Sequence, residues 1–166
     1  MGGLRDSASR DAGLVPAIAQ AARQLTDATG LTPRLKLSPL VAPLPVDVEY
    51  NLLRIAQEAI TNAVKHSGAT TLDVSLENRP DRLVLTIQDH GNGFTVPNND
   101  TMPSGHYGLI GMRERAAQIG AKLQIDSSPG RGATVHLELP LPVSASKIAT
   151  MPSKASLAPS SPELAP

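Results

Sequence analysis

Hydrophobic side chains recur every three or four residues in three parts of the chain, which predicts three amphipathic helices. These stretches are residues 14–29, 46–66 and 109–119, and the second is the longest. Each is followed by a glycine, the residue that most readily adopts the left-handed conformation at a helix end. The three glycines are Gly30, Gly68 and Gly120.

Apolar and polar residues alternate in five shorter stretches, which predicts five strands. A turn containing Pro80 separates the second and third of them and indicates a hairpin. The order is helix, strand, helix, two strands, loop, helix, two strands. This order predicts an α+β fold, a two-layer α/β sandwich whose mixed, mostly antiparallel sheet has helices on one face. The strand stretches are residues 34–37, 72–77, 83–88, 123–125 and 135–139.

Composition limits the possible partners. The 166 residues carry 15 basic and 15 acidic side chains, so no overall field attracts nucleic acid or a membrane surface. There is no cysteine, which excludes disulfides and thiolate metal sites. Aromatic residues make up only 2% of the chain, so we expect any stacking on a base to be aliphatic. No apolar run is long enough to span a bilayer.

Polar groups with ligand chemistry follow one stripe of the longest predicted helix. Arg54, Glu58 and Asn62 lie four residues apart and Lys65 and His66 follow, so we expect all five on one helix face. An amide and a carboxylate one turn apart, followed by a cation, can hold Mg²⁺ and reach phosphate oxygens, because Mg²⁺ prefers hard oxygen ligands. Taken alone, the same pattern is typical of a solvated helix face.

A carboxylate ends the third predicted strand beside a glycine-rich turn. Gly91 and Gly93 follow Asp89, so bare backbone lies next to a group that only accepts hydrogen bonds. Asp89 can accept from the exocyclic amine of adenine, whereas guanine presents an oxygen there and would leave a buried charge unpaired. The motif predicts an adenine site, and by itself it is also typical of an ordinary glycine turn after a strand.

Two further glycine-containing segments could contribute to a nucleotide site. Gly105 to Gly111 precedes the third helix, so the N–H groups of residues 108–111 can point at phosphate oxygens. A flexible loop meeting a helix is the alternative. Thr134, after Gly132, can bring its hydroxyl near Asp89. The polar connector that begins at Phe94 predicts a lid over a nucleotide pocket.

In this order, the segments resemble the conserved boxes of two-component sensor histidine kinases. Arg54 to Ala69 resembles the N box, most closely that of nitrate and membrane-fluidity sensors. Residues 89–94 resemble the first glycine box, residues 105–115 the second, and residues 127–134 the closing Gly-x-Thr element. The resemblance covers about residues 13 to 141. It implies the Bergerat ATP-binding fold of histidine kinases, gyrase-type ATPases, Hsp90-type chaperones and MutL-type repair proteins.

The resemblance also implies roles for individual residues. Asn62 would ligate Mg²⁺, and Asp89 would bind the adenine amine of ATP. Glu58 stands where gyrase-type relatives keep a water-activating glutamate; the alternatives in kinases are orienting the attacking histidine or the metal shell. The remaining expected site residues would neighbour the phosphates, shape the pocket and lid, or support Asp89: Lys65, His66, Gly91, Gly93, Gly108, Leu109, Gly111 and Thr134.

The same resemblance implies a kinase divided between domains. The γ-phosphate would pass to a histidine on a separate dimerisation and phosphoacceptor domain, and a response regulator would act downstream. None of the four histidines here fits such an acceptor. We therefore expect residues 1–13 to be a linker from the missing hairpin, 14–141 the ATP-binding catalytic domain and 142–166 a disordered Pro/Ser/Ala-rich tail. We expect this domain to be cytoplasmic and monomeric by itself, and a membrane-anchored parent is left open.

Two other functions on the same fold remain open from the sequence. One is an anti-sigma-type serine kinase, against which the kinase-like run from Gly108 to Arg115 counts. The other is a non-catalytic nucleotide-binding or docking module, against which the joint presence of Glu58, Asn62 and Asp89 counts.

Overall fold

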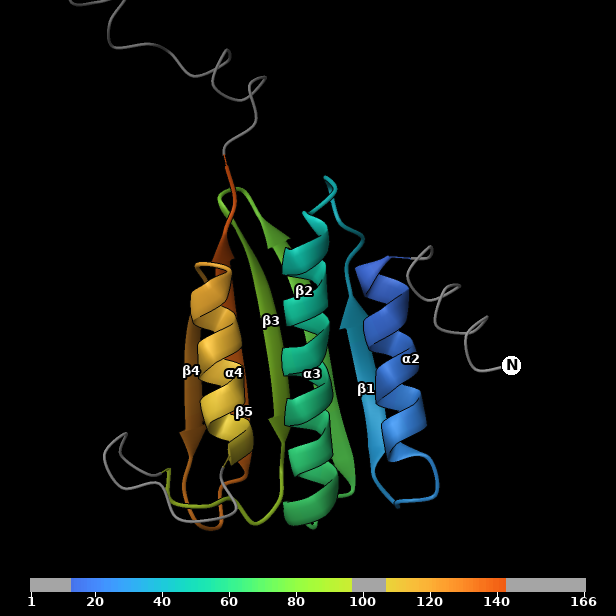
Figure 1. The fold of residues 1–166 in the computed structure, drawn as a ribbon. Coiled ribbons are helices and arrows are strands. Elements are labelled where there is room, and N and C mark those ends of the chain that lie inside the picture. The colour runs from blue at the N-terminus through green and yellow to red at the C-terminus, as the bar shows by residue number, and fades with distance from the viewer. Residues whose placement is uncertain (1–12, 97–106, 143–166) are drawn as a thin grey trace, which may run out of the picture.

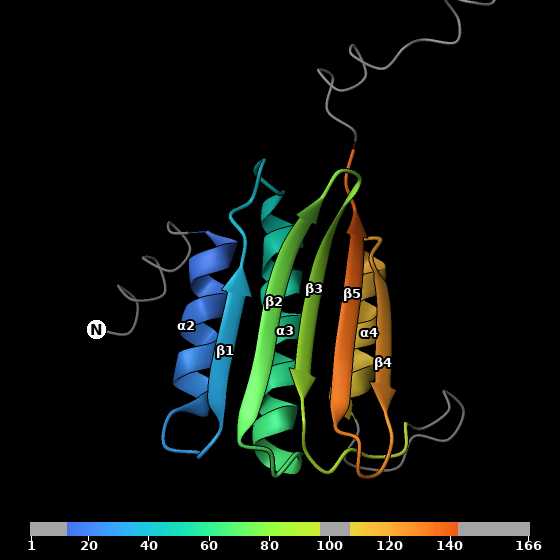
Figure 2. The same ribbon diagram turned by 180° about the vertical axis from the view of Figure 1, so that it is seen from behind.

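The chain forms two layers, with helices packed on one face of a five-stranded sheet (Figures 1 and 2). The computed structural model describes residues 13–96 and 107–142. The predicted N-terminal linker, lid and C-terminal tail lie almost entirely outside these described residues. The opposite face of the sheet carries no described helix, as Figure 2 shows. The predicted two-layer α+β sandwich is confirmed.

The helices of the described residues are α2 (Leu14–Thr26), α3 (Val46–His66) and α4 (Tyr107–Gln118). The bounds of α3 match the prediction. Helix α2 ends three residues earlier than its apolar pattern indicates, and the Thr26 hydroxyl bonds back to the Ala22 carbonyl at 2.6 Å. Helix α4 begins two residues earlier than predicted.

The sheet is mixed and mostly antiparallel, as predicted. Its strand order is β1-β2-β3-β5-β4; β1 pairs in parallel with β2, and the other pairs are antiparallel. The tight hairpin joins β2 to β3. The strands are β1 (Thr32–Leu37), β2 (Thr71–Arg79), β3 (Arg82–Asp89), β4 (Lys122–Ser127) and β5 (Ala133–Pro140).

The core fills the space between the layers. Every second residue of β2 and β3 faces the helices, and Ile60 of α3 is fully buried against them. Burying one such side chain stabilises the fold by about 1.5–3 kcal/mol. The buried face of α3 also carries small side chains, Ala59 and Ala63. These alanines leave room beneath the lower half of α3, where a cavity opens.

Polar side chains cover the other face of the sheet. Arg34 donates two hydrogen bonds to the Asp73 carboxylate, at 2.6 and 2.8 Å, and His90 Nε2 lies 2.7 Å from the same group. The Arg34 guanidinium first, and then the His90 ring, hold the pKa of Asp73 below its usual range. This network belongs to the exposed sheet face and not to the cavity. In the described part of the chain, every helix is too short or too polar to cross a membrane.

Candidate functional site

A cavity of about 420 Å³ opens between α3, the start of α4 and the sheet. Its wall is mostly aliphatic, with side chains from all three elements. The polar residues that line it are Asn62 and His66 from α3, Ser67 directly after that helix, and Asp89 from the end of β3. The aliphatic lining consists of Ala59, Ala63, Ile87, Leu109, Ile125, Ala133 and Val135. A mostly apolar cavity with a few converging polar groups is typical of a small-molecule site.

Asp89 lies in the wall of the cavity and is held in one orientation. Its side chain is buried, with 6% of the residue exposed. One carboxylate oxygen, Oδ1, accepts from the backbone N–H of Gly91 at 3.0 Å and of Ala133 at 3.3 Å. None of the described residues donates a hydrogen bond to the other oxygen, Oδ2. A buried acceptor with a fixed direction suits a ligand that brings an N–H donor.

Glycine is required on both sides of Asp89. A Cβ at Gly91 would collide with the Ser67 carbonyl oxygen, and a Cβ at Gly132 would collide with the carbonyl oxygen of Asp89 itself. Gly132 also has φ +74°, which side chains disfavour. The Asn92 N–H donates to the Ser67 carbonyl at 2.6 Å, so the turn after β3 is tied to the end of α3. Asp89 is thereby fixed relative to Asn62.

The polar stripe of α3 does not stay on one face, so the prediction that all five residues share a face is wrong. A step of four residues turns the helix by about 40° beyond a full turn. Asn62 and His66 consequently face the cavity, whereas Arg54 and Glu58 face a groove on the outer surface of the helices. Lys65 is exposed and lines neither the cavity nor the groove.

The second glycine cluster divides between the same two hollows. Gly108 lines both of them, and a Cβ there would collide with Oε1 of Glu58. Leu109 is buried and faces the cavity. Gly111 lies one turn further along α4, where it faces only the outer groove and a Cβ would meet nothing within 4 Å. The expectation that Gly111 shapes the nucleotide pocket is therefore wrong.

The strand register also corrects the expectation for Thr134. Ala133 pairs with Asp89 in the sheet and lines the cavity with it, whereas Thr134 pairs with Gln88 on the polar face. Neighbouring residues of a strand point to opposite faces, so the Thr134 hydroxyl lies on the other side of the sheet from Asp89. Asp89 receives its support from the backbone of Ala133 instead.

Sequence reasoning missed three contributors to the site. Ala133 supplies a donor to Asp89, and the Ser67 carbonyl anchors the glycine turn. Phe94 lines the cavity, so an aromatic ring is present where only aliphatic stacking was expected. The alternation of β5 could have identified Ala133, because it lies two residues before Val135 on the same face.

Comparison with known proteins identifies the class. Residues 47–143 match the family described as histidine kinase-, DNA gyrase B-, and HSP90-like ATPases. This match spans more than half of the chain, and the chain belongs to that family. The segments that resemble the N box and the glycine boxes lie within the matched residues.

Two similar curated proteins are named as sensor proteins. The sensor protein VraS of Staphylococcus aureus (strain COL) is 45% identical over 98 residues, which is 59% of this chain and 27% of VraS. VraS of Staphylococcus haemolyticus gives the same identity and coverage. The chain thus spans about a quarter of the length of the curated relatives it matches.

Solved structures share the fold. The histidine kinase domain of the blue-light activated kinase of Erythrobacter litoralis EL346 matches with a TM-score of 0.66 and 17% identity, over 78% of this chain and 61% of that chain. The Acinetobacter baumannii histidine kinase AdeS matches with a TM-score of 0.63 and 19% identity, over 76% of this chain and 62% of that chain. At these identities the likeness establishes the Bergerat fold alone.

Two glycine substitutions test the geometry of the site. Gly132→Ala forces a side chain into a left-handed conformation and against Asp89, so we expect a loss of more than about 1 kcal/mol in the free energy of unfolding. Gly111→Ala is the matched control inside α4, where alanine should stabilise the helix by about 0.5–1 kcal/mol. Chemical denaturation measures both. Equal effects of the two substitutions would contradict the geometry.

Proposed function

We propose that residues 14–141 form the ATP-binding catalytic domain of a sensor histidine kinase, which donates the γ-phosphate of ATP to a histidine on another domain. One observation supports the proposal above all others. Asp89, with one oxygen fixed by two backbone N–H groups, and Asn62, with a hard amide oxygen, face the same cavity of about 420 Å³.

The order of the polar residues along α3 suits an extended Mg·ATP molecule. Adenine would lie beside Asp89, with its amine donating to Oδ2 and its ring against Phe94 and the aliphatic wall. The triphosphate would then run along α3 past Asn62 towards Gly108, because four helical residues advance by about 6 Å. The start of α4 presents backbone N–H groups and the positive end of the helix dipole to the phosphates.

The donor set fits a magnesium ion held mainly by phosphate and water. Asn62 faces the cavity, and its side-chain amide has no hydrogen-bond partner among the described residues. Mg²⁺ usually takes only one or two protein ligands beside substrate phosphates. Glu58 faces the outer groove, so Asn62 would be the protein ligand and Glu58 would not. The bound ion would neutralise charge on the phosphate oxygens.

The transfer itself requires a histidine from elsewhere. A ring nitrogen with a free lone pair would form the N–P bond as the bond to the bridging oxygen breaks, and ADP would leave with that electron pair. The other ring nitrogen would release its proton to restore a neutral ring. The Glu58 carboxylate, which lies in the outer groove beside Gly108, would orient that nitrogen and receive its proton.

The wider roles follow from this proposal. A parent protein would supply the dimerisation and phosphoacceptor domain, and a response regulator would receive the phosphate. We propose a cytoplasmic setting, because ATP and the regulator are found there. VraS is described as a sensor protein, and this chain matches 27% of it.

Asp89→Asn should abolish ATP binding while leaving the fold intact. The asparagine oxygen can still accept from Gly91 and Ala133, but its NH₂ group then faces the adenine amine, donor against donor. Burying that mismatch should weaken affinity about 100-fold or more. Isothermal titration calorimetry with ATP tests this, with circular dichroism to verify folding. Tight binding of ATP by this variant would refute the assignment of Asp89.

Asn62→Ala should remove the Mg²⁺ dependence of ATP affinity. The wild-type chain should bind ATP more tightly with Mg²⁺ than with EDTA, because the ion bridges phosphate and the amide oxygen. The variant should give the same dissociation constant in both conditions. Glu58→Gln, which changes a residue facing away from the cavity, is the matched control and should retain the dependence. A variant Asn62→Ala that still responds to Mg²⁺ would count against this role.

Transfer of phosphate tests the function itself. The probe is the VraS chain from which the 98 residues matching this chain are deleted, incubated with this chain and ATP labelled at the γ-phosphate. We expect label on VraS that is lost in acid and stable in base, as phosphohistidine requires. Acid-stable label would indicate a serine kinase. ATP binding without any transfer would indicate a docking module.

A further inference from the structure

The hydroxyl of Ser127 makes two hydrogen bonds beside the cavity, although Ser127 itself does not line the cavity. The hydroxyl accepts from the backbone N–H of Phe94 at 2.8 Å and donates to the carbonyl oxygen of Gly132, also at 2.8 Å. An N–H group can only donate and a carbonyl oxygen can only accept, so the hydroxyl proton points towards Gly132. Ser127 thus links two turns, the one that follows β3 and the one that joins β4 to β5.

The bond to Gly132 acts on Asp89 through one rigid peptide group. The carbonyl of Gly132 and the N–H of Ala133 belong to the same planar trans peptide, so they point in opposite directions and turn together. Ser127 holds the carbonyl end, and the N–H end donates to Oδ1 of Asp89 at 3.3 Å. The strand register agrees, because Ala133 pairs with Asp89 on one side and with Ser127 on the other. The hydroxyl is therefore one peptide group away from the carboxylate.

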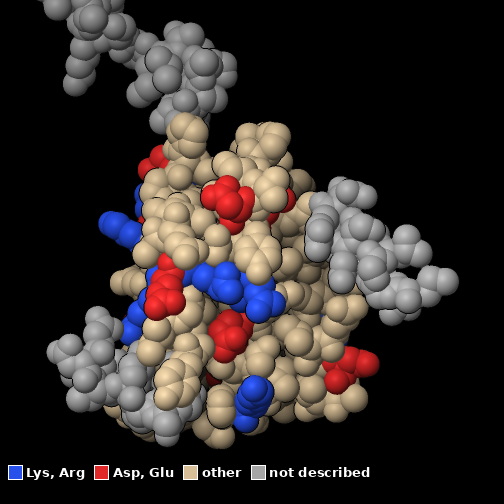
Figure 3. Space-filling model, viewed as in Figure 1, with Lys and Arg blue, Asp and Glu red and all other residues tan. Residues whose placement is uncertain are grey.

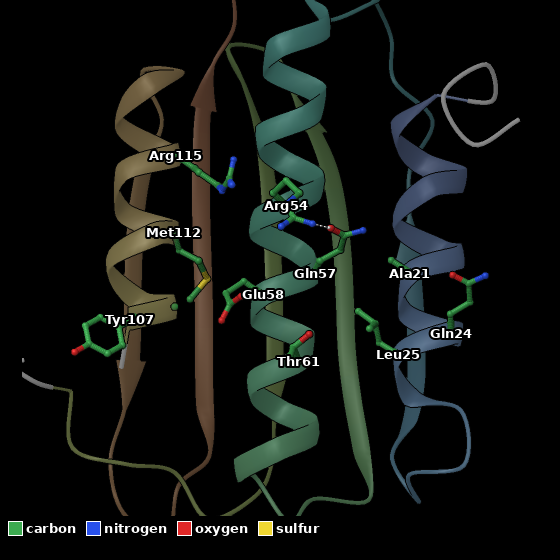
Figure 4. Close-up of a pocket in the computed structure, with 12 residues that line it drawn as sticks. Ala21, Gln24, Leu25, Arg54, Gln57, Glu58, Thr61, Tyr107, Met112 and Arg115 are labelled. Carbon is green, nitrogen blue, oxygen red and sulfur yellow. Dashed lines mark hydrogen bonds between the residues drawn. The ribbon is translucent and has the colours of Figure 1, made fainter. Parts of the chain in front are cut away.

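No charged side chain among the described residues supports Asp89, so the direction of its carboxylate depends on backbone groups. Basic side chains of the helical layer lie elsewhere, and Figure 3 shows them gathered at the middle of the helical face. Figure 4 places Arg54 in the outer groove between α2, α3 and α4, where it donates to Gln57. A change in the tilt of one supporting peptide can consequently redirect the carboxylate.

The two turns are also in direct contact on either side of this link. The Gly130 N–H donates to the Asn92 carbonyl at 2.6 Å, and a Cβ at Gly93 would collide with the Ser128 carbonyl oxygen. These contacts are made by backbone alone. Removing the serine hydroxyl would therefore leave the turns together while the one peptide group becomes free to tilt. The hydroxyl sets a direction more than it holds the fold together.

We propose that Ser127 is a positioning residue that sets the selectivity of the site for an exocyclic amine, because its hydroxyl orients the Asp89 carboxylate through one peptide group. The inference rests on the proposed function, in which Oδ2 of Asp89 accepts from the amine of adenine. With the peptide held, Oδ2 keeps one direction, which favours an N–H donor and disfavours an oxygen at the same place. Without the hydroxyl the carboxylate can turn, so the donor loses its bond and the oxygen loses its repulsion.

Two nucleotides test the role of the hydroxyl, because inosine triphosphate carries an oxygen where ATP carries the exocyclic amine. In calorimetric titrations with Mg²⁺, Ser127→Ala should bind ATP about fivefold more weakly than the wild type, the usual effect of one lost hydrogen bond. It should bind inosine triphosphate no more weakly than the wild type, so the ratio of the two affinities falls. Ser127→Thr keeps the hydroxyl and should keep the ratio. Ser128→Ala, which removes the neighbouring exposed hydroxyl, is the matched control and should also keep it. Circular dichroism verifies folding of each variant.

Each outcome bears on a different statement. A wild-type chain that does not distinguish ATP from inosine triphosphate contradicts the adenine contact of the proposed function, and this inference with it. Discrimination by the wild type together with an unchanged ratio in Ser127→Ala overturns the role of Ser127 alone. Equal weakening of both nucleotides gives that unchanged ratio and shows a merely structural role. A ratio that falls as far in Ser128→Ala or in Ser127→Thr also overturns the inference, because the Ser127 hydroxyl would then not be responsible.

Discussion

The site depends on the two backbone hydrogen bonds that hold one oxygen of Asp89. The Gly91 and Ala133 N–H groups come from segments more than forty residues apart, and both require the close approach that neighbouring glycines allow. With Oδ1 held, Oδ2 has a fixed direction into the cavity. A buried carboxylate without such bonds would be costly to keep charged. The same contacts therefore stabilise the site and determine what it can bind.

Helix α3 connects this carboxylate to the rest of the chemistry. Its regular rotation divides the polar side chains of one helix between two hollows, because every four residues the side chains turn by about 40°. Asn62 and His66 face the nucleotide cavity, while Glu58 and Arg54 face the outer groove. Gly108 lies between the cavity and the groove, and any side chain at this position would displace Glu58. Side chains of one continuous helix thus line two separate hollows.

Most of the fold could be predicted from the sequence. The spacing of hydrophobic residues in a helix, and their alternation with polar residues in a strand, indicate which side chains are buried. The bounds of α3 and the strand faces of β2 follow from their patterns alone. The site was predicted less completely. Thr134 and Ala133 are adjacent, so only the strand register decides which one reaches Asp89. Lys65 was misplaced because the polar stripe of α3 was treated as straight, although the helix rotates. Gly111 was misplaced because α4 begins at Tyr107, so Gly111 lies inside the helix and not in the loop before it. The groove could not be predicted, since it depends on how three helices pack.

We propose the adenine amine as the partner of Asp89, so the most direct measurement compares two nucleotides that differ only there. Calorimetric titration of the wild-type chain with Mg·ATP and with the triphosphate of purine riboside, which lacks the exocyclic amine, gives the two affinities. We expect the analogue to bind at least about tenfold more weakly, because Oδ2 of Asp89 then stays buried without a donor. Equal affinities would contradict that proposal.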